Sequence, residues 1–274
     1  MSIFDEPKID SHCHVLDPAR FPYPADMVYR PSGQEVAPLE QYLQVMEACG
    51  IRHALMVGPN SGYGLDNRCL LDALARGAGR FKGIAVVEPT ITRDELIELR
   101  ARGVIGLAFN ATLLGTDYYQ GCGPLLRTLA DLGMLVSLQV ERDQLVELRG
   151  LIERSEVRVL IDHGGRPAPG AGVDQPGFKA LLELARTGRV AVKLSGFQKY
   201  SALPPPYADI GPFLAALLDV YTLDACLWAS DWPFLRAPQR LDVGPLLRLI
   251  ERLLPDAADR RRLFWDTPQR WLGF

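Results

Sequence analysis

Short apolar runs alternate with helical patterns along nearly the whole chain, and this alternation constrains the fold more than any other feature. Near-continuous hydrophobic runs are typical of strands that are covered on both faces. Eight such strands are expected, at Lys8–Val15, His53–Gly58, Phe81–Val87, Gly103–Phe109, Met134–Val140, Val157–His163, Val190–Ser195 and Cys226–Asp231. Strict β/α alternation over about 250 residues predicts an α/β protein with a single (β/α)8 (TIM) barrel.

Helical segments are expected between these strands, and each has ordinary sequence signals. Pro38 suits the first position of a helix, and Thr92 with Glu95 forms a capping box. The expected helices lie near Pro38–Cys49, Asp66–Arg76, from Thr92 onward, Leu125–Leu132, Gln144–Glu153, Gly177–Arg186, Ile210–Tyr221, Val243–Leu254 and Asp256–Phe264. The Pro- and Tyr-rich stretch from Asp17 to Pro38 is expected to be a long, functional loop.

A doubly wound open sheet is the alternative architecture, and it would need a glycine-rich phosphate-binding turn after the first strand. The chain has no such turn, and no linker or shift in composition marks a second domain. We therefore expect one domain over residues 1–274.

Composition narrows the classes of function. The formal net charge of −3 and the lack of a basic run argue against nucleic acid and anionic membranes as partners. No apolar run reaches the length of a membrane span, and the polar first residues do not resemble a signal peptide. Five scattered cysteines are typical of reduced thiols, so we expect a cytoplasmic protein.

Polar residues fall where the expected strands end. His12 and His14 end the first strand and, by alternation, share one face. His163 ends the sixth strand and Asp231 ends the eighth. Barrels of this kind carry their chemistry at the carboxyl ends of the strands, so these four residues are expected to form a site there.

The remaining ionisable residues near these strands have more ordinary interpretations. His53 begins the second strand, at the opposite end of the barrel, and is expected to be structural. Cys13 faces away from the two histidines and is expected to pack. Asp162 should face outward toward a helix, whereas Asp10 should face inward and orient an imidazole.

Four ordered motifs, together with the chain's last residues, resemble the amidohydrolase superfamily. More narrowly, they resemble the branch that includes 2-pyrone-4,6-dicarboxylate lactonase. The motifs are His12-x-His14, Ile161-Asp-His-Gly-Gly-Arg-Pro167, Val192-Lys-Leu-Ser-Gly196 and Trp228-Ala-Ser-Asp-Trp-Pro233, and the ending is Asp266–Phe274.

The resemblance implies a metal site in some members, with ligands on strands one, five, six and eight. Here the fifth strand offers Gln139 instead of histidine, and the bridging Lys or Glu is missing from the end of the fourth. The lactonase branch shows the same omission and works without metal, so we expect no cofactor. The alternative is one divalent ion, Zn²⁺, held by His12, His14, His163 and Asp231.

The expected activity is ring opening of a small, carboxylated lactone by water. Asp231 would be the general base, and His12, His14 and His163 would stabilise the oxyanion. One alternative is a mononuclear zinc hydrolase or decarboxylase of the same superfamily. Another is a catalytically silent barrel that binds a metabolite. The oligomeric state stays open, and a homo-oligomer is compatible with the sequence.

Loops after the strands offer the candidates for substrate binding. Arg236 is the most attractive, because a guanidinium can clamp a carboxylate with two hydrogen bonds. The others are Tyr29, Arg30, Ser61, Tyr63, Asn110, Tyr118, Lys193, Gln198, Lys199 and Tyr200. Leu107 and Ala108 stand where the pyrone-dicarboxylate enzyme would have arginine, and Phe234 stands where histidine is expected. A sugar lactone, a muconolactone or a singly charged lactone is therefore at least as well supported as a doubly charged pyrone.

Overall fold

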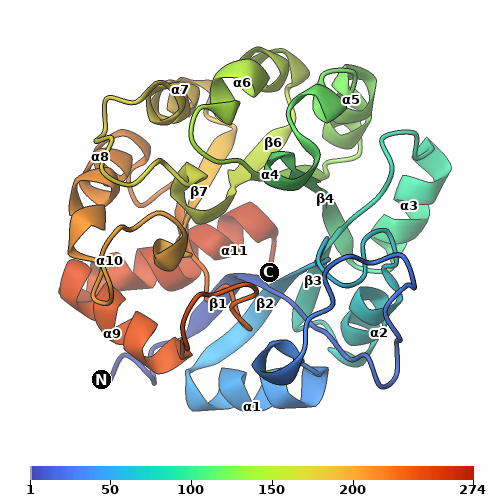
Figure 1. Cartoon of the computed structure of the whole chain (residues 1–274), viewed down its shortest axis with the longest axis horizontal. Coiled ribbons are helices and arrows are strands. Elements are labelled where there is room, and N and C mark those ends of the chain that lie inside the picture. The colour runs from blue at the N-terminus through green and yellow to red at the C-terminus, as the bar shows by residue number, and fades with distance from the viewer. Residues whose placement is uncertain (1) are drawn as a thin grey trace. The chain divides into compact units, whose positions relative to one another are not determined.

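The computed structural model describes residues 2–274, and its eight strands form one sheet in chain order, with helices between successive strands (Figure 1). The strands are β1 (Lys8–Cys13), β2 (Ile51–Val57), β3 (Phe81–Ala85), β4 (Val104–Asn110), β5 (Leu135–Gln139), β6 (Arg158–Ile161), β7 (Val190–Leu194) and β8 (Cys226–Trp228). Consecutive strands pair in parallel, for example β1 with β2 and β5 with β6. The predicted (β/α)8 barrel is confirmed.

The helices begin largely where the sequence signals place them. They are α1 (Leu39–Ala48), α2 (Arg68–Arg76), α3 (Arg93–Ala101), α4 (Ala111–Leu114), α5 (Gly123–Asp131), α6 (Gln144–Ser155), α7 (Pro176–Leu184), α8 (Gly211–Tyr221), α9 (Val243–Leu253), α10 (Ala257–Arg261) and α11 (Thr267–Leu272). The capping box is formed, since the Thr92 amide donates to Glu95 Oε2 at 2.8 Å. A π-helical turn, Arg262–Asp266, joins α10 to α11 where a continuous helix to Phe264 was expected.

The long loop after β1 is present as expected and contains one 3-10 turn, Gly33–Glu35. It packs against the loop that follows β2. Gly62 has φ +87°, and a Cβ there would lie 2.9 Å from Pro31 and 3.0 Å from Tyr23. Glycine is therefore required at this close approach, which holds the two loops together.

The described residues group into two compact units. The first unit contains the residues up to Val86, Leu99–Val104 and Trp228–Phe274, and the second contains Val87–Glu98 and Ile105–Leu227. In the first unit, the segment after β8 pairs with β1. The Asp231 amide donates to His12 O at 2.9 Å, and the His14 amide donates to Trp232 O at 2.8 Å. β1 thus has a partner on both edges, β2 and this segment.

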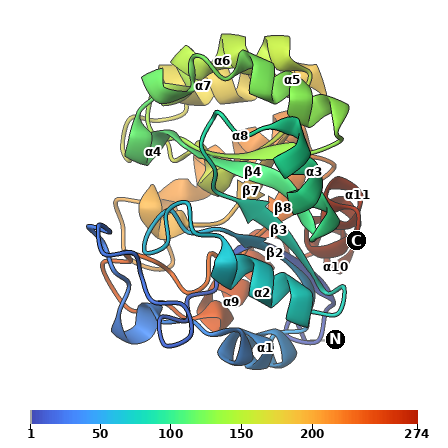
Figure 2. The same ribbon diagram turned by 90° about the vertical axis from the view of Figure 1, so that its right-hand side faces the viewer.

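In the second unit, each strand has one face toward the helices and one face toward the barrel interior. Figure 2 shows α5, α6 and α7 side by side along this unit. Val136 and Val159 line one small apolar space with Leu148 and Ile152 of α6. Because side chains alternate along a strand, Ser137 and Leu160 point to the opposite face, the interior. Burial of each such aliphatic side chain stabilises the fold by about 1.5–3 kcal/mol.

All five cysteines are buried free thiols, as the sequence predicted. Cys13 is the last residue of β1, and its Sγ lies 3.8 Å from Leu55 O of β2. Within residues 2–274, no helix combines the length and the apolar character that crossing a membrane would require.

Candidate active site

Two imidazoles and one carboxylate meet at the end of β1. His12 Nε2 and His14 Nε2 lie 3.2 Å apart, and the two rings stand nearly perpendicular at 87°. His12 Nε2 lies 3.9 Å from Asp231 Oδ1. All three side chains are buried. The predicted shared face of the two histidines, and the approach of Asp231 to them, are thus present within the first unit.

The hydrogen bond of the second ring nitrogen of His14 indicates which ring nitrogens of the two histidines carry a proton. His14 Nδ1 lies 2.7 Å from the carbonyl oxygen of Val57, at the end of β2. A carbonyl only accepts hydrogen bonds, so Nδ1 carries the proton and, in the neutral ring, Nε2 carries a lone pair. The contact between the two Nε2 atoms then requires His12 to be the donor. We assign these tautomers from the hydrogen-bond partners.

Asp231 reaches the histidines through a turn. The expectation that it ends the eighth strand is wrong, because β8 stops at Trp228. Asp231 has φ +62°, in the left-handed region that non-glycine residues seldom adopt. Its carbonyl accepts from the Phe234 amide at 2.8 Å, and its own amide bonds to His12 O. These backbone bonds hold the carboxylate beside His12.

Asp10 lies beneath the cluster, fully buried, as expected for an inward-facing residue. Its carboxylate accepts from Tyr42 Oη at 2.8 Å, Ser230 N at 2.8 Å, Ser230 Oγ at 2.5 Å and His12 N at 3.2 Å. Asp10 therefore holds backbone and hydroxyl groups rather than orienting an imidazole ring. Burial raises the pKa of Asp10 above its usual value, against these hydrogen bonds, which act to lower it.

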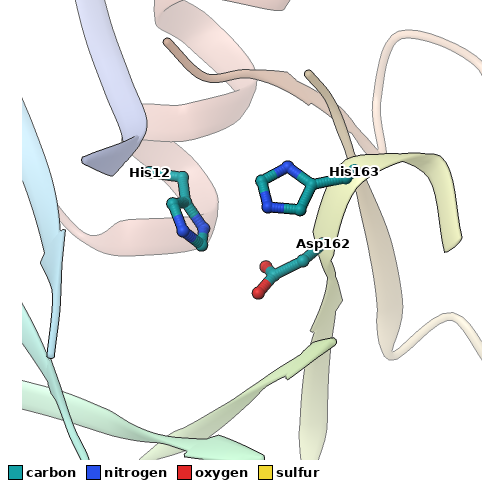
Figure 3. A group of neighbouring side chains, drawn as sticks. All are labelled: His12, Asp162 and His163. Carbon is teal, nitrogen blue, oxygen red and sulfur yellow. The ribbon is translucent and has the colours of Figure 1, made fainter. Parts of the chain in front are cut away.

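His163 follows β6 in the second unit and lies in a turn where its backbone is left-handed. It has φ 52° and ψ 46° within the 3-10 turn Asp162–Gly165. His163 Nδ1 lies 3.0 Å from Ser195 Oγ, and His163 Nε2 lies 3.3 Å from Lys199 Nζ. Figure 3 shows Asp162 and His163 leaving this turn next to each other and also draws His12. The imidazole is thus held by two residues that come after β7.

The prediction that Asp162 faces outward toward a helix is wrong. Asp162 Oδ1 lies 2.8 Å from Lys193 Nζ and accepts from Ser137 Oγ at 2.9 Å. The register explains the error, because Val159 faces α6 and Leu160 therefore faces the interior, together with Asp162 two residues later. His163 avoids the helix-facing side because its φ breaks the alternation. Asp162 and Lys193 form a buried ion pair.

Several substrate-binding candidates of the first unit lie in the loops and contact one another. The Arg236 guanidinium stacks on the Tyr29 ring at 4.3 Å, and the Arg236 amide donates to Glu35 Oε1 at 2.6 Å. Tyr29 also donates to Glu35, while Arg30 donates to Ala25 O. Arg236 is exposed. Ser61 lies partly exposed in the turn after β2, near buried Tyr63.

Two of the substrate-binding candidates in the second unit make hydrogen bonds to other residues of the protein. Asn110 caps α4, since its Oδ1 accepts from Leu113 N at 3.1 Å. Tyr118 donates to Glu88 Oε2 at 2.8 Å. Gln198 and Lys199 form a partly exposed 3-10 turn after β7, and Tyr200 next to them is buried.

Sequence reasoning missed Tyr42 and Ser230, both partners of Asp10. Tyr42 reads as a core residue of α1, because it lies on the same buried face as Leu39 and Met46. Its position next to a carboxylate depends on how α1 packs, which no local pattern encodes. Ser230 adjoins Asp231 in the sequence, and this adjacency was the one available signal.

His53 lies at the opposite end of β2, among aromatic side chains. Its ring packs 4.8 Å from Phe274 and 5.8 Å from Trp265. Burial lowers the pKa of His53. This histidine therefore belongs to the packing of the carboxyl-terminal residues.

The first-unit cluster has a donor set that suits a divalent metal ion. His12, His14 and Asp231 each offer one ligand atom, and these atoms all lie within 4.8 Å of one another. Two imidazole nitrogens and a carboxylate oxygen are ordinary zinc ligands. The cluster could therefore hold a metal ion in place of the hydrogen bond between His12 and His14.

Comparisons with known proteins agree on one family. The amidohydrolase family model matches residues 9–274. A 4-sulfomuconolactone hydrolase of Rhizobium radiobacter is 37% identical, over 96% of this chain and 89% of its own length. A 2-pyrone-4,6-dicarboxylate hydrolase of Comamonas testosteroni is 29% identical, over 96% and 88%.

A solved structure agrees with these sequences. The crystal structure of a protein from Acinetobacter baumannii, described as a probable 2-pyrone-4,6-dicarboxylic acid hydrolase, has a TM-score of 0.86 and 26% identity. The match covers 97% of this chain and 99% of that one. The chain therefore belongs to the amidohydrolase family, in the branch of lactone hydrolases that the sequence motifs predicted.

Proposed function

We propose that this protein opens the ring of a small, carboxylated lactone with water. The observation that carries the proposal is the buried Asp231 carboxylate 3.9 Å from His12 Nε2, with His14 beside it. A carboxylate next to imidazoles can accept a proton from water while the imidazoles bind a developing negative charge. The names of the relatives support a lactone as the class of substrate.

In the proposed reaction, Asp231 takes a proton from water, and the resulting hydroxide attacks the lactone carbonyl carbon. The carbonyl π electrons move to oxygen, and His12, His14 and His163 stabilise the oxyanion. When the tetrahedral intermediate collapses, the ring C–O bond breaks, and the leaving oxygen receives the proton from Asp231. We assign His163 to this group because the carboxyl ends of barrel strands share one rim.

We further propose that the reaction needs no metal. The fifth strand offers Gln139 in place of a histidine ligand, and the Gln139 amide donates to Thr112 Oγ1 at 2.8 Å. In the alternative, His12, His14 and Asp231, with His163, would hold one divalent ion, which would polarise the carbonyl and lower the pKa of water. Metal analysis and chelation distinguish the two. We expect activity to survive a chelator, whereas loss of activity that zinc restores would contradict the metal-free reaction.

The decisive variant is Asp231→Asn, assayed by acid release from a panel of neutral and carboxylated lactones. Removing a general base is expected to lower kcat by about 10²–10⁴-fold. Asp174→Asn is the matched control, because Asp174 lies at the surface and pairs with Lys179. Near-wild-type hydrolysis by Asp231→Asn would overturn the assigned base. Tight binding of a lactone without any hydrolysis by the wild-type protein would favour a metabolite-binding barrel instead.

A further inference from the structure

Lys199 occupies an unusual position beside a catalytic histidine. It ends the 3-10 turn Phe197–Lys199, which begins directly after Gly196 at the end of β7. Its Nζ atom lies 3.3 Å from His163 Nε2, the ring nitrogen that faces away from Ser195. The side chain is half-buried. An ammonium group therefore lies next to the atom through which His163 would otherwise contact an oxyanion.

The backbone around Lys199 is built to hold this contact. Gly196 has φ +62°, and a Cβ there would lie only 2.7 Å from His163 Nδ1, so the turn packs directly on the imidazole. On the other side of Lys199, Tyr200 is 1% exposed, and its hydroxyl would lie 3.3 Å from a Cβ on Gly164. Residues on both sides of Lys199 are thus fixed against the turn that carries His163.

The hydrogen bonds determine which group can donate to an oxyanion. A lysine ammonium has donors only, so His163 Nε2 accepts from Lys199 and carries no proton. His163 Nδ1 then carries the proton and donates to Ser195 Oγ, 3.0 Å away. In this arrangement the neutral imidazole has no Nε2 proton to give. In the first unit, the Nε2 proton assigned to His12 is directed at His14.

We propose that Lys199 is a catalytic residue whose ammonium group binds the oxyanion of the tetrahedral intermediate. The proposal rests on the lactone hydrolysis proposed above and adds the positive charge of an ammonium group to the contribution of the imidazoles. His163 then contributes to stabilisation of the oxyanion through Lys199, which it positions through Nε2, and it is itself held by Ser195. A donor at an oxyanion typically contributes about 10²–10³-fold to kcat.

The test measures kcat and KM of Lys199→Met, Lys199→Gln and Lys199→Arg on one neutral and one carboxylated lactone. We expect kcat to fall by about 10²-fold or more on both lactones in the Met and Gln variants. Lys199→Arg keeps a cation and should recover part of the loss. Lys179→Met is the matched control, since it removes a lysine from the exposed surface of α7, and it should retain wild-type kinetics.

Two kinetic results would overturn the proposal. A rise in KM confined to the carboxylated lactone would mean that Lys199 binds a fixed charge of the substrate. Unchanged kcat on both lactones would mean that it has no role in the reaction. If the wild-type protein hydrolyses no lactone, the proposed function fails and this inference with it. Wild-type activity with a fully active Lys199→Met variant rejects the inference alone.

An independent readout examines the contact itself. In ¹⁵N-histidine spectra of this four-histidine chain, the His163 nitrogens should show a protonated Nδ1 and an unprotonated Nε2. His163→Asn identifies the resonances. Replacement of Lys199 by Met should shift the Nε2 signal, because its donor is removed. An unchanged signal would show that Lys199 does not donate to His163, which contradicts the inferred hydrogen-bond order.

Discussion

The histidines at the end of β1 and the histidine after β6 have different electrostatic neighbours. His12 lies 3.9 Å from the Asp231 carboxylate, whereas His163 lies 3.3 Å from the Lys199 ammonium. His12 is therefore placed beside a carboxylate, whereas His163 has the Lys199 ammonium beside it and also the Asp162 carboxylate within 4.8 Å. The first arrangement suits proton removal from water, and the second suits stabilisation of negative charge. Residue type alone does not reveal this division, because imidazole can serve either purpose.

The two buried aspartates beneath these histidines differ in the same way. Asp10 is held by four hydrogen bonds from Tyr42, Ser230 and the His12 amide. Asp162 is held by the Lys193 ammonium and the Ser137 hydroxyl. A buried carboxylate needs either an opposite charge or several donors. The two units thus use different means for the same requirement, and removal of one partner should have different consequences in each.

The largest expected effect comes from removing the cation of the second unit's ion pair. Lys193→Met leaves the Asp162 carboxylate buried without the Lys193 ammonium, which should lower the free energy of unfolding by about 3–5 kcal/mol. Urea denaturation measures this change. Asp162→Asn in the Lys193→Met background should recover part of the loss, because it removes the buried carboxylate charge. A loss below about 1 kcal/mol in the single variant would contradict the importance of the pair.

A smaller effect is expected for Arg236, the exposed cation of the first unit. If Arg236 clamps a carboxylate, Arg236→Ala removes charge-assisted hydrogen bonds of about 1.5–3 kcal/mol. KM for a carboxylated lactone should then rise about tenfold or more, with little change in kcat. A neutral lactone provides the control, since its KM should not change. An equal effect on both lactones would show that Arg236 acts by packing on Tyr29. Arg236 would then not differ from Lys199 by binding the carboxylate of the substrate.

Ser195→Ala should have a more modest effect on the second unit's histidine. The variant removes the oxygen that accepts from His163 Nδ1 but leaves Lys199 in place. Loss of one hydrogen bond of about 1–1.5 kcal/mol should lower kcat about five- to tenfold. Steady-state kinetics measures the change, and Ser201→Ala, in the loop after Tyr200, serves as a control. A loss as large as that of Lys199→Met would mean that Ser195 acts directly on substrate.

The smallest expected effect concerns the first unit's aspartate. Tyr42→Phe removes one of the four hydrogen bonds to Asp10 and leaves the ring contact with Trp232, at 4.9 Å, in place. The free energy of unfolding should fall by about 1 kcal/mol. Thermal and urea unfolding both report this change. A loss comparable to that of Lys193→Met would show that the Tyr42 hydrogen bond alone provides most of the stabilisation of the buried Asp10 carboxylate.

The barrel could be predicted from the sequence, and so could the side chains that we propose to be catalytic. Apolar runs of strand length and helical periodicities are local patterns, and each is set by the solvent exposure of consecutive residues. The placement of His12 and His14 on one face follows from the two-residue period of a strand. That polar residues at strand ends gather at one rim follows from the barrel itself.

The directions of Asp162, Asp231 and His163 depended on the tertiary structure. A shift of one residue in register reverses the face of a side chain, and the chain leaves regular strand geometry at all three positions. Asp231 and His163 take left-handed backbone conformations that only their surroundings hold in place.

The sequence by itself therefore predicted the (β/α)8 barrel and selected His12, His14, His163 and Asp231 as the candidate site residues. Only the tertiary structure decided that Tyr42 and Ser230 support Asp10, and that Lys199 lies on His163. The physical reason is the range of the interactions. Burial periodicity acts between neighbours in the chain, whereas a hydrogen bond between residues 10 and 230 exists only after helices and strands have packed.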